Sequence, residues 1–305
     1  MSATRGASPA HDVGRGLPEA SLEIVASLAQ HRALSTEQVR TIHLPRVKQR
    51  WCQRVLARIA AAGLIAHARA TGSPRRLWFA TEPGIRAAVR ARALARGPRA
   101  LEPDEVSGPL QAHTAAVNEA AISFLRAARE RGDEFGPLAW RHEVAHSLRP
   151  GARGRRARAV IADAVLTYLR LTEETVFVEQ RFLEVDRATL PVDAMAAELA
   201  RYAELFRAVA EDGVPLWRSR YPTFPAVLCV LAGGSDREAL ERRRDTALAL
   251  LAGDPQLART PEVAIRICLL EDLLGVGPFG AIFGERRDPG RAVDWLGGPV
   301  GRAGR

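Results

Sequence analysis

Two neighbouring β-rich segments, residues 160–171 and 175–185, constrain the fold of this chain more than any other stretch. Branched and apolar side chains dominate both segments and a short polar turn separates them, so they predict a β-hairpin. Acids interrupt the pattern: Asp163 lies inside the first segment, and Glu184 and Asp186 lie around the end of the second. A carboxylate among apolar strand residues is costly unless it is paired or binds a metal, so these acids mark a candidate site.

The acids of the hairpin have two interpretations. Paired strands bring Asp163 close to Glu184 or Asp186, and converging carboxylate oxygens are the ligands that Mg²⁺ or Mn²⁺ requires. Such an ion would suit phosphodiester chemistry, because it activates water and stabilises a leaving oxygen. Alternatively, Asp163 caps a turn, while Glu184 and Asp186 pair with nearby arginines.

The charge of the chain favours a polyanionic partner. Its 305 residues carry a net charge of +9, and Lys48 is the only lysine, so arginine supplies nearly all of the positive charge. A basic protein of this kind is expected to bind nucleic acid before membrane. No apolar run approaches the roughly 18 residues of a membrane span, and Cys52, Cys229 and Cys268 show no zinc or disulfide spacing. We therefore expect a cytoplasmic protein with buried thiols.

The first hundred residues predict a winged helix-turn-helix. Apolar spacing and capping signals predict three helices and then a short β-hairpin, over residues 19–31, 36–42, 46–62, 64–70 and 75–80. The third helix is expected to bury an apolar stripe under the first two helices, at Val47, Trp51, Val55 and Ile59. Its other faces are basic and polar, and they stay free to enter a major groove of DNA.

The residues expected to contact double-stranded DNA come from the third helix, from the wing and from a basic Gly-rich loop before the long hairpin. They are Arg46, Lys48, Gln49, Arg50, Gln53, Arg54, Arg69, Arg75, Arg76, Arg153, Arg155 and Arg156. Arginine and glutamine on the helix can reach base edges, while the wing and the loop suit backbone phosphates. The alternative is that these side chains only solvate a surface, or that the wing mediates dimerisation.

The second half of the chain alternates helices and β-rich segments, which predicts a mixed sheet with helices on its faces and an α/β (α+β) fold class. A nearly all-apolar run, residues 224–231, predicts a central strand buried on both faces. Acids at the strand ends form the candidate catalytic set, which is Glu143, Asp163, Glu184 and Asp186. The expected organisation begins with a disordered segment (residues 1–18), a winged helix (19–97) and a linker (98–112). An α/β domain (113–284) and a flexible tail (285–305) follow.

Several scattered features of the chain occur together in one known family. After the winged helix comes a helix that opens with His113 and has Asn118 downstream, and then a strand with the pair Asp163-Ala164. A Glu-Val-Asp-Arg-x-Thr run follows at residues 184–189, and the next helix contains the pair Arg201-Tyr202. This layout, over most of residues 20–230, resembles the replication-relaxation family of actinobacterial plasmids. The second part of that family is in turn similar to the PD-(D/E)XK, or restriction-endonuclease-like, fold.

The resemblance implies a restriction-endonuclease-like mixed-sheet domain behind the winged helix. In that fold an Asp on one strand and a Glu-x-Lys on the next bind metal and position water, which implies Asp163 and Glu184 as ligands of Mg²⁺ or Mn²⁺. The chain departs from the motif at Ala162, where the motif has Pro, and at Asp186, where it has Lys. Since an acid cannot replace that lysine, Arg201 on the next helix is the candidate to reach back to the site.

Three functions stay open at this point. The leading hypothesis is a DNA-binding protein of plasmid or mobile-element replication, relaxation or transfer, with a nuclease-like domain that is weak or inactive. The second is an active endonuclease that depends on Mg²⁺ or Mn²⁺. The third is a winged-helix transcriptional regulator with a dimerisation or sensing domain. The expected partners are double-stranded DNA, replication or transfer proteins and, as an open case, a second copy of the chain, with no membrane.

Overall fold

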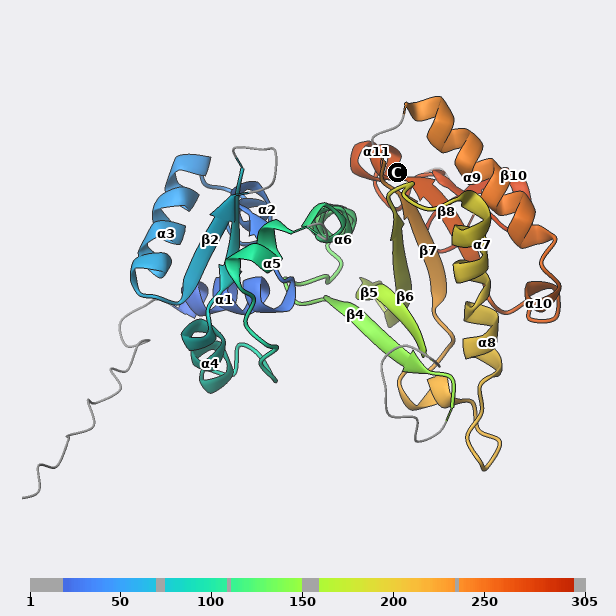
Figure 1. Cartoon of the computed structure of the whole chain (residues 1–305), viewed down its shortest axis with the longest axis horizontal. Helices are drawn as coiled ribbons and strands as arrows, with labels where there is room; N and C mark the ends of the chain where they lie inside the picture. Colours follow the sequence, from blue (N-terminus) through green and yellow to red (C-terminus); the bar gives the residue numbers. More distant parts are fainter. Residues whose placement is uncertain (1–18, 70–74, 109–110, 150–158, 234–235, 299–305) are drawn as a thin grey trace, which may run out of the picture. The chain divides into compact units, whose positions relative to one another are not determined.

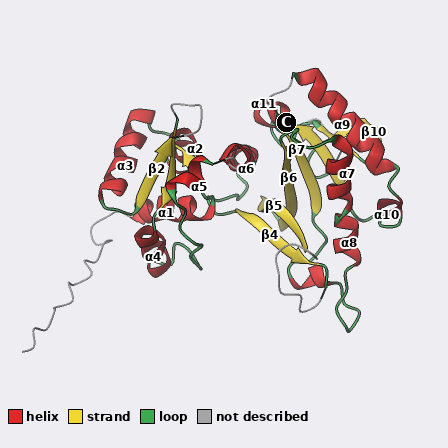
Figure 2. Cartoon of the chain, in the orientation of Figure 1, coloured by secondary structure: helices red, strands yellow, loops and turns green. Residues whose placement is uncertain are grey.

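A computed structural model of the protein describes residues 19–69, 75–108, 111–149, 159–233 and 236–298. The chain divides into two compact units between Gln111 and Ala112. Helices and a small antiparallel sheet form the first unit, and a larger mixed sheet with helices forms the second (Figures 1 and 2). The predicted α+β class is therefore confirmed. The segment expected to be disordered, residues 1–18, lies outside the described residues.

The first unit consists of helices followed by a hairpin. Its elements are α1 (Glu19–Gln30), β1 (Leu34–Ser35), α2 (Thr36–His43), α3 (Gln49–Ala61), β2 (Ile65–Arg69), β3 (Arg76–Ala80), α4 (Glu82–Arg90) and α5 (Pro103–Ser107). The predicted order of three helices and a hairpin is present. Strand β3 is the central strand, because it pairs antiparallel with both β2 and β1. The sequence does not predict β1, since two residues are too short for a periodic pattern.

The start of α2 shows how local chemistry sets this topology. The Ser35 hydroxyl accepts a hydrogen bond from the Gln38 N–H at 3.1 Å, and the Gln38 side chain accepts one from the Ser35 N–H at 2.9 Å. This reciprocal arrangement satisfies two backbone donors at the helix end and typically stabilises a helix by about 1 kcal/mol. Ser35 and Gln38 thus form a capping box at the start of α2.

The buried face of α3 differs from the predicted one. Cys52, Leu56 and Ile59 are fully buried, whereas Trp51 keeps 46% of its surface exposed. The predicted stripe is thus wrong at Trp51, although Ile59 belongs to both stripes. The reason is that two apolar stripes lie one residue, or about 100° of helix rotation, apart. The stripe that contains the smaller cysteine packs inward.

Part of the predicted linker is folded onto the first unit. Helix α5 inserts Val106, which is 3% exposed, into a cluster with Ala33, Leu77 and Phe79. Pro103 opens the helix, and the Glu105 carboxylate accepts the Glu102 N–H at 2.9 Å. Proline and acids here begin a helix, in agreement with their preference for the first helical turn.

The second unit holds the longer elements. They are α6 (Gln111–Arg131), β4 (Trp140–Ser147), β5 (Ala159–Leu171), β6 (Val176–Asp186), α7 (Val192–Ala200), α8 (Tyr202–Arg207), a 3₁₀ turn (Leu216–Ser219), β7 (Ala226–Leu231), α9 (Arg237–Ala252), α10 (Pro255–Ala258), β8 (Ile265–Leu269), α11 (Leu270–Gly275), β9 (Phe283–Glu285) and β10 (Asp288–Val293). In the described part of the chain no helix is both long and apolar enough to cross a membrane.

The sheet of the second unit is mixed, with the strand order β10-β9-β8-β7-β6-β5-β4. Strands β4, β5 and β6 are successive antiparallel neighbours, which confirms the long hairpin. Strands β6, β7 and β8 are parallel, and β9 and β10 return antiparallel at the far edge. Strand β7 is central, and it is buried from Val227 to Leu231, as its apolar sequence predicts.

Helices α7, α8 and α9 cover one face of this sheet (Figure 1). Their apolar side chains pack with those of β6, β7 and β8, around Phe182, Leu199 and Cys229. All three cysteines of the chain are buried and unpaired, in agreement with the expectation. A separate cluster of rings joins α6, β5 and the C-terminal segment, where Trp295 contacts Phe124 and Tyr168.

The C-terminal segment is structured, in contrast to the flexible tail expected for residues 285–305. Strand β10 extends the sheet, and Trp295 beyond it is fully buried. The Arg266 guanidinium donates a hydrogen bond to the Trp295 carbonyl at 3.3 Å. The Gly- and Arg-rich composition of this segment suggested a loose tail, but a single buried tryptophan supplies enough apolar area to anchor it. Residues 299–305 lie outside the described part.

Candidate functional site

The register of the long hairpin places the first two acids together. Strands β5 and β6 pair from Leu171 opposite Val176 to Ala164 opposite Leu183. One step further, Asp163 stands across from Glu184, and the two carboxyl groups interact directly. Sequence reasoning expected this juxtaposition because antiparallel strands bring opposite residues to about 5 Å.

Asp163 is held from two sides. One carboxylate oxygen, Oδ1, lies 3.0 Å from Nε2 of His113 at the start of α6. The other oxygen, Oδ2, accepts the Val185 backbone N–H at 2.8 Å, so the side chain takes the place of a ladder hydrogen bond at this point. The Asp163 side chain remains 25% exposed. The acid is therefore fixed in position but still reachable from solvent.

Glu184 is the more deeply placed carboxyl group. The Tyr202 hydroxyl, at the first position of α8, donates a short hydrogen bond to its Oε1. Burial and the charge of Asp163 raise the pKa of Glu184 well above its ordinary value, and the bond from Tyr202 only partly opposes them. A carboxyl group with such a raised pKa holds its proton and can donate it to the neighbouring carboxylate.

The contact with Asp163 also determines the protonation of His113. Its hydrogen bond to Asp163 is the main cause of a raised pKa, which burial partly offsets. The bond favours an imidazolium that faces a carboxylate, next to a protonated Glu184. We define these four side chains, His113, Asp163, Glu184 and Tyr202, as the acid cluster. The two carboxyl groups of the cluster hold one proton between them, which resembles sites where two carboxyl groups share a proton.

Asp186 does not join the acid cluster. Its Oδ2 lies 2.5 Å from Nε of Arg243 on α9, and both side chains are nearly buried, with 10% and 13% exposed. Arg243 also donates to the Leu190 carbonyl at 2.8 Å. The alternative interpretation, in which an acid at the strand end pairs with an arginine, thus describes Asp186. At the position where the motif has a lysine, this chain has Asp186, and Arg243 on α9 neutralises its charge.

Arg201 and Glu143 occupy less direct positions. Arg201 lies between α7 and α8, and its guanidinium donates to the Ala159 carbonyl at 2.8 Å, at the beginning of β5 rather than at Asp163. Glu143 lies on β4 with a positive φ of 49°, opposite Asp163 at the one position that the β4–β5 pairing skips. Its charge contributes to the raised pKa of His113. The negative charge of Glu143 therefore favours the protonated form of His113.

The donor set is compatible with a divalent cation. Asp163 and Glu184 offer adjacent carboxylate oxygens, and Mg²⁺ commonly uses only one or two carboxylates and keeps several waters. Within the described ranges no group of three or more His, Cys, Asp and Glu is arranged to hold a metal. Since a ligand must be deprotonated, an ion here would have to displace the proton of Glu184.

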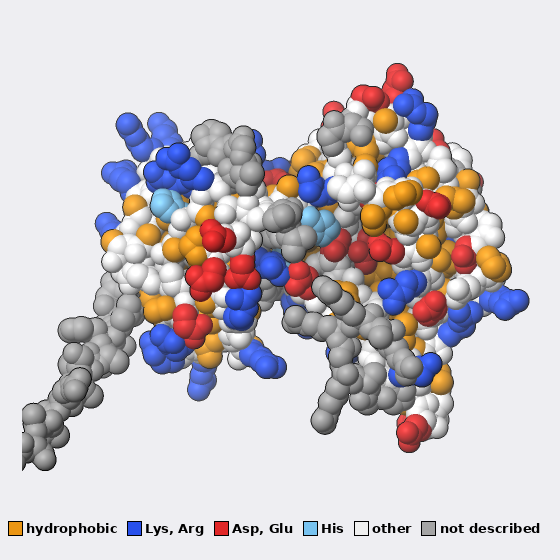
Figure 3. Space-filling model, viewed as in Figure 1, with side chains coloured by type: hydrophobic (Ala, Val, Ile, Leu, Met, Phe, Trp, Pro, Cys, Tyr) orange, Lys and Arg blue, Asp and Glu red, His pale blue; other side chains and the backbone are white. Residues whose placement is uncertain are grey.

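The predicted DNA-contact residues of the first unit lie on its surface. Arg46, Lys48, Gln49, Arg50, Gln53, Arg54, Arg69, Arg75 and Arg76 are all exposed. Figure 3 shows arginine and lysine side chains projecting from the side of the first unit on which α3 lies. The arginines of the β2–β3 hairpin flank residues 70–74, which lie outside the described residues. Arg153, Arg155 and Arg156 also lie outside the described residues.

Trp51 is a surface residue that the sequence pattern assigned to the core. It lies on α3 near the exposed Arg50, Arg54 and Arg58, and two of these, Arg54 and Arg58, follow it at helical spacing. An exposed tryptophan between cations is unusual on a solvated helix and is enriched where surfaces recognise a partner. We name this basic and aromatic surface of Arg50, Trp51, Arg54 and Arg58 the α3 face.

The fold and the site define an α+β protein of two units, one with an exposed basic helix and one with an acid cluster at its hairpin. The sequence profile described as replication-relaxation matches residues 25–214. This match covers more than half of the chain, so the chain belongs to the replication-relaxation family. No curated protein and no solved structure matches it.

Three contacts of the site escaped the sequence patterns. Arg243 is one of three consecutive arginines on α9, and nothing local distinguishes it from Arg242 and Arg244. The contacts of His113 and Tyr202 also join elements far apart in the chain. Both residues belong to the features that suggested the family, so the resemblance was the available signal for them. Asn118 from the same set is buried and accepts a hydrogen bond from Trp140 at 3.1 Å.

Replacing Glu184 by glutamine is expected to stabilise the protein at neutral and alkaline pH. A raised pKa means that the folded state binds a proton that the unfolded state releases, so stability falls as the pH rises above the ordinary value of 4.5. Glutamine cannot titrate and keeps the bond from Tyr202. We expect a gain of roughly 1–3 kcal/mol at pH 8, typical of relieving a buried polar group, and little difference at pH 4.

Thermal unfolding at both pH values measures this effect. Glu262→Gln is the matched control, because Glu262 is exposed and its replacement should leave the unfolding midpoint nearly unchanged. An equal shift in both variants, or a destabilised Glu184→Gln protein at pH 8, would contradict a protonated Glu184.

Proposed function

We propose that this protein binds double-stranded DNA and acts in the replication or relaxation of a plasmid or mobile element. The observation that carries the proposal is the exposed, basic α3 face on a three-helix and hairpin unit. Membership of the replication-relaxation family supports the same biological setting. In a winged helix-turn-helix of this order, the third helix would enter the major groove and the hairpin would touch the flanking backbone.

The physical case rests on charge and shape together. Arg50, Arg54 and Arg58 repeat along one side of α3, and no acid occurs within this helix. Arginine can donate two hydrogen bonds to a guanine edge or pair with a phosphate, and an apolar ring can contact the thymine methyl group. The basic loop at Arg153, Arg155 and Arg156 is a further proposed phosphate contact.

We further propose that the second unit is a nuclease-like module of weak or no activity. Its acid cluster has the Asp and Glu of a PD-(D/E)XK site, but the lysine position holds Asp186, which Arg243 neutralises. The proton that Glu184 retains also opposes metal binding. Such a module could bind DNA ends or forks, or contact replication or transfer proteins, without cutting DNA.

A salt titration of DNA affinity tests the proposal. Fluorescence anisotropy with a labelled 30-base-pair duplex, from 50 to 300 mM NaCl, should give a steep linear fall of log affinity with log salt. Four to six phosphate contacts predict a slope of about −4 to −5, because each contact releases nearly one counterion. A flat salt dependence, or no binding at 50 mM NaCl, would reject DNA binding.

An active endonuclease is the second candidate, because Asp163 and Glu184 face each other as metal ligands would. A bound Mg²⁺ or Mn²⁺ would supply activation of water and stabilisation of the leaving oxygen. His113 would orient Asp163, and Tyr202 would orient Glu184. This candidate predicts nicking of supercoiled DNA in Mn²⁺ that stops with chelator and with Asp163→Ala. Intact DNA after prolonged incubation of a preparation that binds the same DNA would exclude it.

A further inference from the structure

The N-terminal half of β6 has an open edge. Leu169 and Thr167 on β5 direct their backbone bonds away from β6, toward Glu134 and Ala139. Their cross-strand partners on β6, Val178 and Gln180, therefore point their own backbone groups to the other side. On that side β7 begins only opposite Arg181. The N–H and C=O groups of Val176 and Val178 thus have no partner among the described residues.

This edge is apolar and uncharged. Val176, Phe177 and Val178 are 55%, 41% and 52% exposed, the longest run of exposed large hydrophobic residues in the described chain. Edge strands of monomeric proteins are usually protected by charges, prolines or bulges. The segment from Thr175 to Val178 has none of these, which is the pattern of a strand that pairs with another chain.

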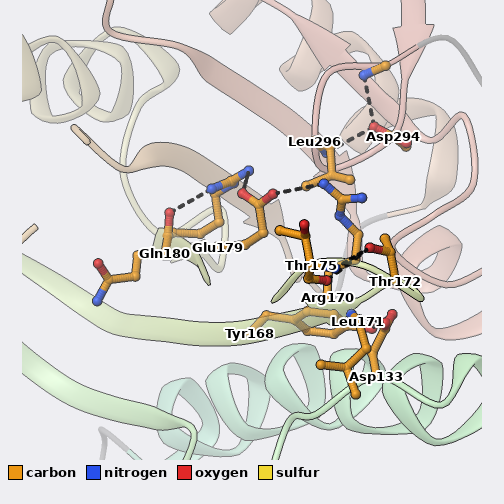
Figure 4. A network of polar contacts seen from close by, with 12 residues as sticks. Asp133, Tyr168, Arg170, Leu171, Thr172, Thr175, Glu179, Gln180, Asp294 and Leu296 are labelled. Carbon is orange, nitrogen blue, oxygen red and sulfur yellow. Dashed lines mark hydrogen bonds and ion pairs between the residues drawn. The ribbon is translucent and has the colours of Figure 1, made fainter. Parts of the chain in front are cut away.

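A network of polar contacts braces the turn next to this edge (Figure 4). Asp133 accepts hydrogen bonds from the Tyr168 hydroxyl and the Leu171 N–H, both at 2.8 Å. Thr172 closes the turn by bonds to Thr175 at 3.0 Å. The Arg170 guanidinium lies 4.3 Å from the centre of the ring of Phe177, its cross-strand partner. A preorganised strand loses little entropy when a partner strand is added.

We propose that this edge pairs with the same edge of a second copy of the chain, forming a continuous antiparallel sheet across a two-fold axis. The backbone groups of Val176 and Val178, which have no partner among the described residues, determine the register of this pairing. Gln180 is excluded, because its carbonyl already accepts the Arg181 guanidinium at 2.8 Å. Val176 of one copy then faces Val178 of the other, and Val178 of the first copy faces Val176 of the second. The two-fold axis passes between the two copies of Phe177. This isologous arrangement makes four backbone hydrogen bonds.

The charges of the strand fit a second copy. In this register Glu179 lies opposite Thr175 of the other copy, so no like charges are opposed. The two Phe177 rings come together at the axis, as in favourable cross-strand aromatic pairs. The proposal is independent of DNA binding, because the edge belongs to the second unit and the α3 face to the first.

A disulfide across the axis tests this register in the full-length protein. Residues that face each other in a non-hydrogen-bonded antiparallel pair have Cα atoms about 4.5 Å apart, which suits a disulfide. Phe177→Cys should therefore form a reducible dimer on a non-reducing gel under mild oxidation. Val178→Cys should not, because its two copies lie diagonally. The native cysteines are buried and give no background.

Light scattering over 1–100 µM supplies the second measurement. The unmodified protein should dimerise, and Val178→Pro, which removes one edge donor without breaking the pairing with β5, should raise the dimer dissociation constant at least tenfold. Val276→Lys is the matched control, since Val276 is 64% exposed on another element. A monomer at 100 µM, or equal cross-linking of the two cysteine variants, would overturn the proposal. Val178→Lys serves if the proline variant does not fold.

Discussion

Replacing Arg50 and Arg54 together by alanine is expected to lower the affinity for duplex DNA by roughly 100-fold at 100 mM NaCl. Each arginine that reaches a base edge or phosphate typically contributes about 1–3 kcal/mol, and both side chains are exposed on the α3 face. The slope of log affinity against log salt should become less negative by about one for each phosphate contact that is lost. Anisotropy titrations at several salt concentrations measure both quantities.

The control removes the same charge from another helix of the same unit. Arg86 and Arg90 lie exposed on α4, and Arg86 already pairs with Glu82 at 3.1 Å. Their replacement by alanine should change the affinity by no more than about threefold, which is under 1 kcal/mol. If both double variants lose affinity equally, the binding reflects net charge alone, and α3 has no special role.

Replacing Arg243 by alanine is expected to destabilise the second unit by about 3 kcal/mol. The change leaves the nearly buried Asp186 without its partner, and breaking a buried ion pair on one side is among the costliest substitutions. For a unit of this size the midpoint of thermal unfolding should fall by roughly 6–12 °C. Arg242→Ala, on the neighbouring exposed residue, should have almost no effect, because its contact with Glu238 is fully solvated.

A second substitution identifies the cause of the loss. Adding Asp186→Asn to the Arg243→Ala protein should recover part of the stability, since it removes the unpaired charge. If the double variant is less stable than the single one, the loss comes from the packing of the arginine stem. In that case Asp186 would have another partner, and its neutralisation by Arg243 would lose its support.

The parts of the fold that follow from local pattern could be predicted from the sequence. The long hairpin, the central strand β7 and the cap at Ser35 each depend on residues that are close together in the chain. The meeting of Asp163 and Glu184 was predictable for the same reason, since a short turn fixes the register of the two strands. These features need no knowledge of the tertiary structure.

The remaining features depend on which of several similar residues the tertiary structure selects. Arg243 lies 57 residues from Asp186, and only packing distinguishes it from its two neighbouring arginines. Trp51 and Cys52 occupy adjacent stripes of one helix. Packing against α2, where the Cys52 thiol donates to the Thr36 carbonyl, decides which stripe turns inward. The tail was misjudged because one buried tryptophan outweighs a composition rich in glycine and arginine.

The position of Trp295 has a consequence for biosynthesis. Its ring contacts Phe124 on α6 and Tyr168 on β5, so the second unit cannot complete its packing until Trp295 has left the ribosome. The first unit ends at Gln111 and can fold much earlier. At ordinary rates of translation this interval lasts about 10–40 s. During it, a folded helix-and-hairpin unit is tethered to an unfinished sheet, which is open to premature strand pairing or to capture by chaperones.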